Sequence, residues 1–127
     1  MSAEERRIIA VPENKNLPFS TVVGFGDLIF VSGMIGRDPE TGQIAADIVE
    51  QTRQTLANVE AQLAKAELSL VNVLKATVFI TDMRLVQEMN KAYRDFFKDG
   101  LPARSCVQVA ALPDSEALVE IEVIAHR

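Results

Sequence analysis

Two stretches near the C-terminal end of the chain alternate strictly between two classes of residue. They cover residues 101–110 and 118–125. Because successive side chains leave a β-strand on opposite faces, this period of two predicts two strands. The loop between them, residues 111–117, is short and contains a proline and an Asp-Ser pair. We therefore expect the two strands to be antiparallel neighbours.

This predicted pair of strands has one mainly apolar face and one polar face. The apolar face is expected to hold Ser105, Val107, Val109, Val119, Ile121, Val123 and Ala125. The polar face is expected to hold Arg104, Cys106, Gln108, Glu120 and Glu122. A polar strand face commonly just meets solvent. Cysteine, however, is among the most buried residue types, so its presence here favours a lined cleft or a subunit interface.

Further apolar runs upstream predict more strands. Residues 20–23 and 28–32 flank a Gly-Phe-Gly-Asp turn, which indicates a hairpin. Residues 71–80 are rich in Val, Thr, Ile and Phe, which favours a strand. Residues 1–17 are expected to be an entry segment, since Pro12 and Pro18 discourage helix.

Two amphipathic helices are predicted from apolar residues at helical spacing, over about residues 46–66 and 85–97. Asp47 is suited to cap the first helix or to stand in its first turn. The expected buried positions are Ile48, Leu56, Val59, Leu63 and Ala66 in the first helix and Leu85, Met89, Tyr93 and Phe96 in the second. Asn90 lies next to the expected buried positions of the second helix. A polar residue at such a place more often borders the buried face than binds a ligand.

This order of elements predicts an α+β fold in a single domain spanning residues 1–127. Two helices would cover one face of a mixed sheet of about five to six strands. The other face would carry the polar groups of the last two strands. Symmetric association of copies of the chain would cover it.

Composition narrows the class of partner. The net charge is −5, with no Trp and one Tyr, so neither a basic footprint nor a stacking surface for nucleic acid is evident. Cys106 is the only cysteine, which excludes an intramolecular disulfide and a cysteine-based metal site within one chain. No apolar run has the length of a signal peptide or a membrane span. We expect a cytoplasmic protein whose partners are small anions or proteins rather than nucleic acid.

Several segments carry a family resemblance. They are Pro-Ala-Arg-Ser-Cys-Val-Gln-Val-Ala at residues 102–110, Val-Glu-Ile-Glu at 119–122, Val-Ser-Gly at 31–33, Gln-Thr-Arg-Gln at 51–54 and Thr-Val-Phe-Ile-Thr-Asp-Met at 77–83. With them, the chain from about residue 18 closely resembles the reactive-intermediate deaminase A (RidA/YjgF) family. The resemblance implies a homotrimer of chorismate-mutase-like subunits with clefts between neighbours. It also implies hydrolysis of 2-imino acids, such as 2-iminobutanoate and 2-iminopropanoate, to 2-keto acids and ammonia.

The resemblance further implies which residues form the site. Arg104 would bind the substrate carboxylate and Glu120 would be the acid near the attacked carbon. The substrate-binding positions would be Arg104, Cys106, Ser32, Asn90, Phe19 and Gly33. Neither a cofactor nor a metal is expected.

The chemistry of these residue types agrees with that activity. The planar fork of Arg104 suits two parallel hydrogen bonds to a carboxylate, which would hold the adjacent C=N carbon in place. Glu120, expected on the same sheet face, would orient a water and pass a proton to the leaving nitrogen. Cys106 as a nucleophile is disfavoured, because the lone His126 is far along the chain.

Three positions depart from the family pattern. Phe19 stands where a tyrosine is common, Met34 where a glutamine is frequent and Leu17 where a glycine is frequent. The missing hydroxyl at Phe19 leaves open a non-catalytic role as a small-ligand binder or chaperone-like partner. An endoribonuclease activity, assigned to some relatives, is another alternative, although the acidic balance argues against it.

Overall fold

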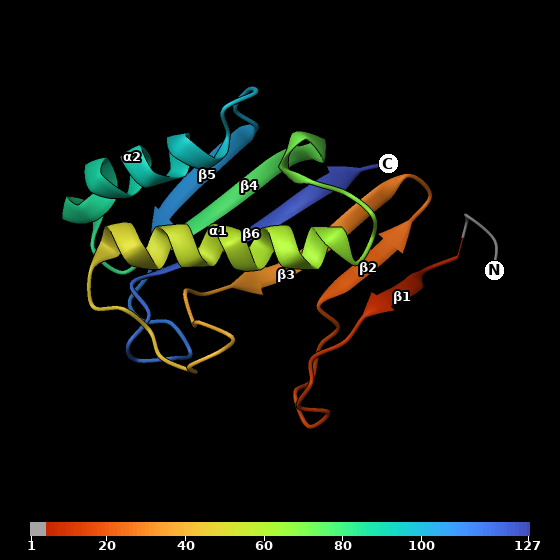
Figure 1. Cartoon of the computed structure of the whole chain (residues 1–127), viewed down its shortest axis with the longest axis horizontal. Coiled ribbons are helices and arrows are strands. Elements are labelled where there is room, and N and C mark those ends of the chain that lie inside the picture. Colours follow the sequence, from red (N-terminus) through yellow and green to blue (C-terminus); the bar gives the residue numbers. More distant parts are fainter. Residues whose placement is uncertain (1–4) are drawn as a thin grey trace.

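The structure is a computed structural model that describes residues 5–127, so the first four residues of the expected entry segment lie outside the described residues. The described chain forms six strands and two α-helices (Figure 1). The strands are β1 (Arg7–Ala10), β2 (Val22–Phe25), β3 (Leu28–Met34), β4 (Val73–Ile80), β5 (Ala103–Gln108) and β6 (Val119–His126). The helices are α1 (Ile48–Ala64) and α2 (Val86–Phe96), with short 3₁₀ turns at Leu70–Asn72 and Met83–Leu85.

The strands form one mixed sheet in the order β1-β2-β3-β6-β4-β5. All neighbours are antiparallel except β4 and β5, which are parallel. Both helices lie on the same face of this sheet (Figure 1). The predicted α+β architecture, with two helices on one face of a mixed sheet, is confirmed. None of the helices among residues 5–127 is long and apolar enough to cross a membrane.

Local sequence accounts for the position of α1. The carboxylate of Asp47 accepts a hydrogen bond of 2.9 Å from the backbone N–H of Val49, so this residue is the predicted N-cap. The hydroxyl of Thr52 donates to the carbonyl of Ile48, which lets a polar residue sit fully buried in the helix row. All five apolar positions predicted for this helix are buried.

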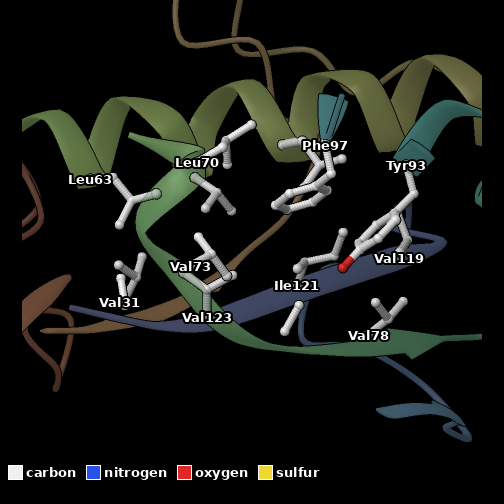
Figure 2. Close-up of a cluster of buried hydrophobic side chains, with 14 of the residues drawn as sticks. Val31, Leu63, Leu70, Val73, Val78, Tyr93, Phe97, Val119, Ile121 and Val123 are labelled. Atoms are coloured by element: carbon white, nitrogen blue, oxygen red, sulfur yellow. The ribbon is translucent and has the colours of Figure 1, made fainter. Parts of the chain in front are cut away.

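The core lies between the helices and the sheet. Figure 2 shows Leu63 of α1 and Tyr93 of α2 with Val78 of β4 and Ile121 of β6, in one apolar cluster. Of the positions predicted for the second helix, Met89 and Tyr93 are buried, whereas Leu85, in the 3₁₀ turn before α2, and Phe96 are only half-buried. Phe97, just beyond the end of α2, is buried more deeply than Phe96.

The expected pairing of the last two strands is wrong. Strand β5 pairs in parallel with β4, and β6 lies between β3 and β4. The reason is the crossover through α2, which returns the chain parallel to β4 and places β5 at the edge of the sheet. The loop before β6 then carries the chain past β4. Strand β1 was also not predicted: it lies in the expected entry segment and pairs with β2.

This strand order changes which side chains share a face. Residues level with each other on adjacent strands point to the same side of the sheet. Arg104 is level with Ala76, which is level with the buried Val123, so Arg104 lies on the helix-covered face. Glu120 is level with Phe79. Ala76 and Phe79 are an odd number of positions apart on β4, so their side chains point to opposite faces of the sheet. Glu120 therefore lies on the face opposite to Arg104. The expectation that Arg104 and Glu120 share one face of the sheet is therefore wrong.

The same register corrects the other assignments. Cys106 is level with Val78 and Gln108 with Ile80, both of them core residues under the helices. Ser105, which was expected on the apolar face, is instead level with Thr77 on the side away from the helices.

The face opposite the helices is left uncovered by the described chain. One row across it consists of Ile8, Val23, Phe30 and Ile124, which are level with one another on four strands. Of these, Ile8 is 48% exposed and Phe30 is 41% exposed. Contiguous apolar surface of this kind commonly marks an interaction site.

Candidate functional site

The residues singled out by the resemblance fall mainly into two clefts. The first, called here the arginine cleft, has a volume of about 170 Å³. It is lined by Asn90, Tyr93, Arg94, Leu101, Pro102 and Arg104. It lies between α2 and the edge strand β5, so its position follows from the crossover that connects them.

The guanidinium of Arg104 rests on the ring of Tyr93, with its central carbon 4.8 Å from the ring centroid. This geometry allows a cation–π interaction, which leaves the N–H groups of the guanidinium available for a ligand. The ring itself is anchored against Phe97, at a centroid distance of 4.7 Å. Burial raises the pKa of the Tyr93 hydroxyl, and the positive charge of Arg104 opposes that rise.

Two buried polar atoms border this cleft without a hydrogen-bond partner among residues 5–127. They are Oδ1 of Asn90 and the hydroxyl of Tyr93. Unsatisfied buried polar atoms are uncommon and call for an additional partner such as a ligand or water. Cys106 lies on the same sheet face as Arg104, but it packs against the hydrophobic core.

The second cleft, called here the glutamate cleft, is larger, at about 600 Å³. Its polar wall includes Ser32, Gly33, Asn58, Gln62 and Glu120, and Phe19 also lines it. It extends from the uncovered sheet face around the end of β3 to α1. The four residues Glu120, Ser32, Gly33 and Phe19 that the resemblance indicated are thus brought together, away from Arg104.

Glu120 has an environment that favours its neutral form. Burial raises the pKa of this carboxyl, and the negative charge of Glu122 raises it further. The carboxyl packs directly over Gly33, where a Cβ atom would lie only 2.8 Å from Cδ of Glu120. A residue without a side chain is therefore needed at position 33 for the carboxyl to take this place.

Hydrogen bonds hold the walls of the glutamate cleft. The hydroxyl of Ser32 donates to the carbonyl of Ser20 at 2.6 Å, which ties β3 to the segment that follows Phe19. The amide of Asn58 donates to the carbonyls of Ile35 and Arg37, at 2.9 and 2.8 Å. An ion pair between Arg37 and Asp114 joins two further lining residues. These contacts hold the walls of the glutamate cleft in place.

The sequence pattern singled out Arg104 and Glu120 as candidates but did not indicate the residues around them. The stacking of Tyr93 under Arg104 and the contribution of Asn58 and Gln62 from α1 depend on contacts between distant segments, for which the local pattern carries no signal. Among residues 5–127, no group of three or more His, Cys, Asp or Glu side chains is placed to hold a metal ion.

Comparison with known proteins identifies the family. The family model described as endoribonuclease L-PSP matches residues 12–127. The chain belongs to the YjgF/RidA family. The resemblance found in the sequence is thereby confirmed.

Relatives in this family are similar over nearly their whole length. "Putative reactive intermediate deaminase TdcF" of Escherichia coli K12 is 43% identical over 113 residues, which is 87% of each chain. The crystal structure of the E. coli YjgF gene product matches with a TM-score of 0.88 and 38% identity, covering 95% of this chain and 98% of that chain. The structure of E. coli TdcF with bound serine matches with a TM-score of 0.85 and 40% identity, covering 95% and 96%.

Proposed function

We propose that the protein hydrolyses reactive 2-imino acids to 2-keto acids and ammonia, at a composite site that two copies of the chain form together. The arginine cleft of one copy and the glutamate cleft of the next would face each other in a homotrimer. The observation that carries the proposal is the position of the two key groups. A guanidinium that has no ion-pair partner within the described chain lies on the edge strand, and a carboxyl with a raised pKa lies on the uncovered sheet face.

The sheet itself argues for a second copy. Within one chain, Arg104 and Glu120 lie on opposite faces, so no small substrate can contact both. Because β5 is an edge strand, Arg104 can reach past the edge toward a neighbouring molecule. The uncovered face, with its exposed Phe30 and Val107, is the surface that such a neighbour would cover.

The chemistry divides between the two groups. The fork of Arg104 binds the substrate carboxylate with two parallel hydrogen bonds and so holds the C=N carbon in place. Glu120 takes a proton from a water and returns it to the nitrogen, a role for which a raised pKa is suited. The water oxygen bonds to the carbon to give a carbinolamine. Glu120 then carries the remaining hydroxyl proton to the nitrogen, the C–N bond breaks as the C=O bond forms, and the nitrogen leaves as ammonia. One imino acid and one water thus give one keto acid and one ammonia.

The relatives support this substrate class. The name of the E. coli relative TdcF refers to deamination of reactive intermediates, and its solved structure contains serine. Serine has the carboxylate and the nitrogen-bearing carbon that a 2-imino acid also has. Bound serine is thus consistent with a cleft that recognises amino-acid-like molecules.

A coupled assay tests the proposal. A threonine dehydratase generates 2-iminobutanoate, and its disappearance is followed with and without this protein. We expect faster disappearance with the parent protein and a loss of about a hundredfold in kcat/KM for Arg104→Ala, since a hydrogen bond to a charged group contributes about 1.5–3 kcal/mol. Arg104→Lys retains the charge but loses the fork, so its activity should also fall.

A matched control separates this role from a general effect of charge. Arg53→Ala removes an exposed arginine of α1 whose one ion pair among residues 5–127 is with Glu50 on the helix surface, and it should retain the parent rate. An unchanged imine lifetime with the parent protein would reject the enzyme hypothesis. Full activity in Arg104→Ala would reject only the role assigned to this arginine and would leave the enzyme hypothesis standing.

A further inference from the structure

The glutamate cleft is much larger than the smallest 2-imino acids require. Its volume of about 600 Å³ falls in the range of pockets that bind whole drug-sized ligands. In the proposed assembly, the neighbouring copy takes part of this space. A larger substrate side chain would occupy the rest of it.

Apolar residues also line the glutamate cleft. Together they are called here the apolar wall, which consists of Pro12, Leu17, Phe19, Met34, Ile35 and Pro113. Leu17 and Phe19 are 44% and 47% exposed in the chain. Exposed apolar side chains that line a concave surface favour an apolar occupant, because binding removes their surface from water.

The apolar wall is assembled from segments that are separate in the sequence. Leu17 and Phe19 come from the loop before β2, and Met34 is the last residue of β3.

The deep end of the cleft also contains polar atoms. Oγ1 of Thr21 and Oε1 of Gln62 are buried there without a hydrogen-bond partner among residues 5–127. Bound water would satisfy both atoms.

We propose that the apolar wall binds the side chain of the substrate, so that the preferred 2-imino acids carry a larger aliphatic side chain, such as that derived from leucine. This inference rests on the proposed function and specifies the substrate class of the same site. Leucine has three side-chain carbons more than alanine. At about 0.8 kcal/mol per buried methylene, partial burial of these carbons corresponds to a preference of at least about tenfold in kcat/KM.

The test compares two substrates in one assay. An amino acid oxidase, with catalase present, generates the imino acid of alanine or of leucine, and the acceleration of its hydrolysis is measured at several protein concentrations. The parent protein should favour the leucine-derived imine by at least about tenfold. Met34→Gln should reduce that ratio by several fold, since an amide on the wall must be desolvated when the aliphatic chain binds.

Two further variants make the result specific. Leu17→Gly changes the same wall from an exposed loop position, so it tests the wall even if Met34→Gln folds poorly. Met83→Gln is the matched control: it makes the same chemical change at a 37% exposed methionine outside the cleft and should keep the parent ratio.

The outcomes separate the two proposals. Acceleration of the alanine-derived imine with no preference for the leucine-derived one would overturn the inference and leave the proposed function standing. So would a preference that neither Met34→Gln nor Leu17→Gly changes, because another surface would then read the side chain. No acceleration of either imine would overturn the proposed function itself. In that case, binding of the stable keto acids of alanine and leucine, measured by calorimetry, would still decide whether the wall selects an aliphatic chain.

Discussion

Mixing two inactive variants is expected to restore activity, because the proposed site takes Arg104 from one copy and Glu120 from another. Arg104→Ala chains lack the carboxylate-binding fork but keep the acid. Glu120→Gln chains lack the acid but keep the fork. Each variant alone should be nearly inactive in the imine assay, since every site in its assembly lacks the same group.

The expected recovery follows from the strand order. Because the registers of β5 and β6 on β4 place Arg104 and Glu120 on opposite faces of one sheet, the proposed site must combine two chains. In an equal mixture with random assortment, half of the arginine clefts and half of the glutamate clefts are intact, so about one quarter of the shared sites hold both groups. The mixture should therefore regain about one quarter of the parent activity per chain.

The experiment uses co-expression of the two variants at equal levels with the same tag, followed by purification of all assemblies together and sizing of the product. A parallel mixture combines the parent chain with the Arg104→Ala, Glu120→Gln double variant. Shared sites predict about one quarter of the parent activity in this mixture, whereas a site within one chain predicts about one half. No recovery in the first mixture, together with about one half in the second, would refute the reasoning from the strand order.

Two further predictions concern the surroundings of the key groups. Tyr93→Leu removes the ring beneath the guanidinium of Arg104 and should raise KM about two- to thirtyfold with a smaller effect on kcat, since cation–π contacts contribute about 0.5–2 kcal/mol. Tyr93→Phe retains the ring and should behave like the parent; equal KM values for the parent and Tyr93→Leu would contradict a positioning role. Glu120→Gln should raise the thermal stability above that of the parent at pH 8. Burial holds the folded pKa of Glu120 above its ordinary value of 4.5, so the carboxyl begins to destabilise the fold as the pH rises past 4.5, and the effect is complete above the folded pKa. The stability difference should shrink toward pH 4 in thermal melts, and a difference that grows on acidification would show that the sign is wrong.

Much of the local structure was determined by the sequence alone. The spacing of Ile48, Leu56 and Leu63 predicted the buried stripe of α1, and Asp47 was identified as its cap, because helix faces and caps depend on residues within a few positions of each other. The hairpin of β2 and β3 was predicted for the same reason. The motif around Arg104 was sufficient to identify the family, which the family model confirms.

The pairing of the strands was decided only by the tertiary structure. Alternation in residues 103–108 shows that two faces exist, but either face of such a strand can be the inner one until its neighbour and register are known. The crossover through α2 made β4 that neighbour and turned Arg104 and Cys106 toward the helices. A long-range pairing of this kind depends on how separate elements pack, and no local window of sequence contains it. The sequence therefore singled out Arg104 and Glu120 as candidate site residues, and the packing of β5 against β4 decided that one chain holds them on opposite faces of its sheet.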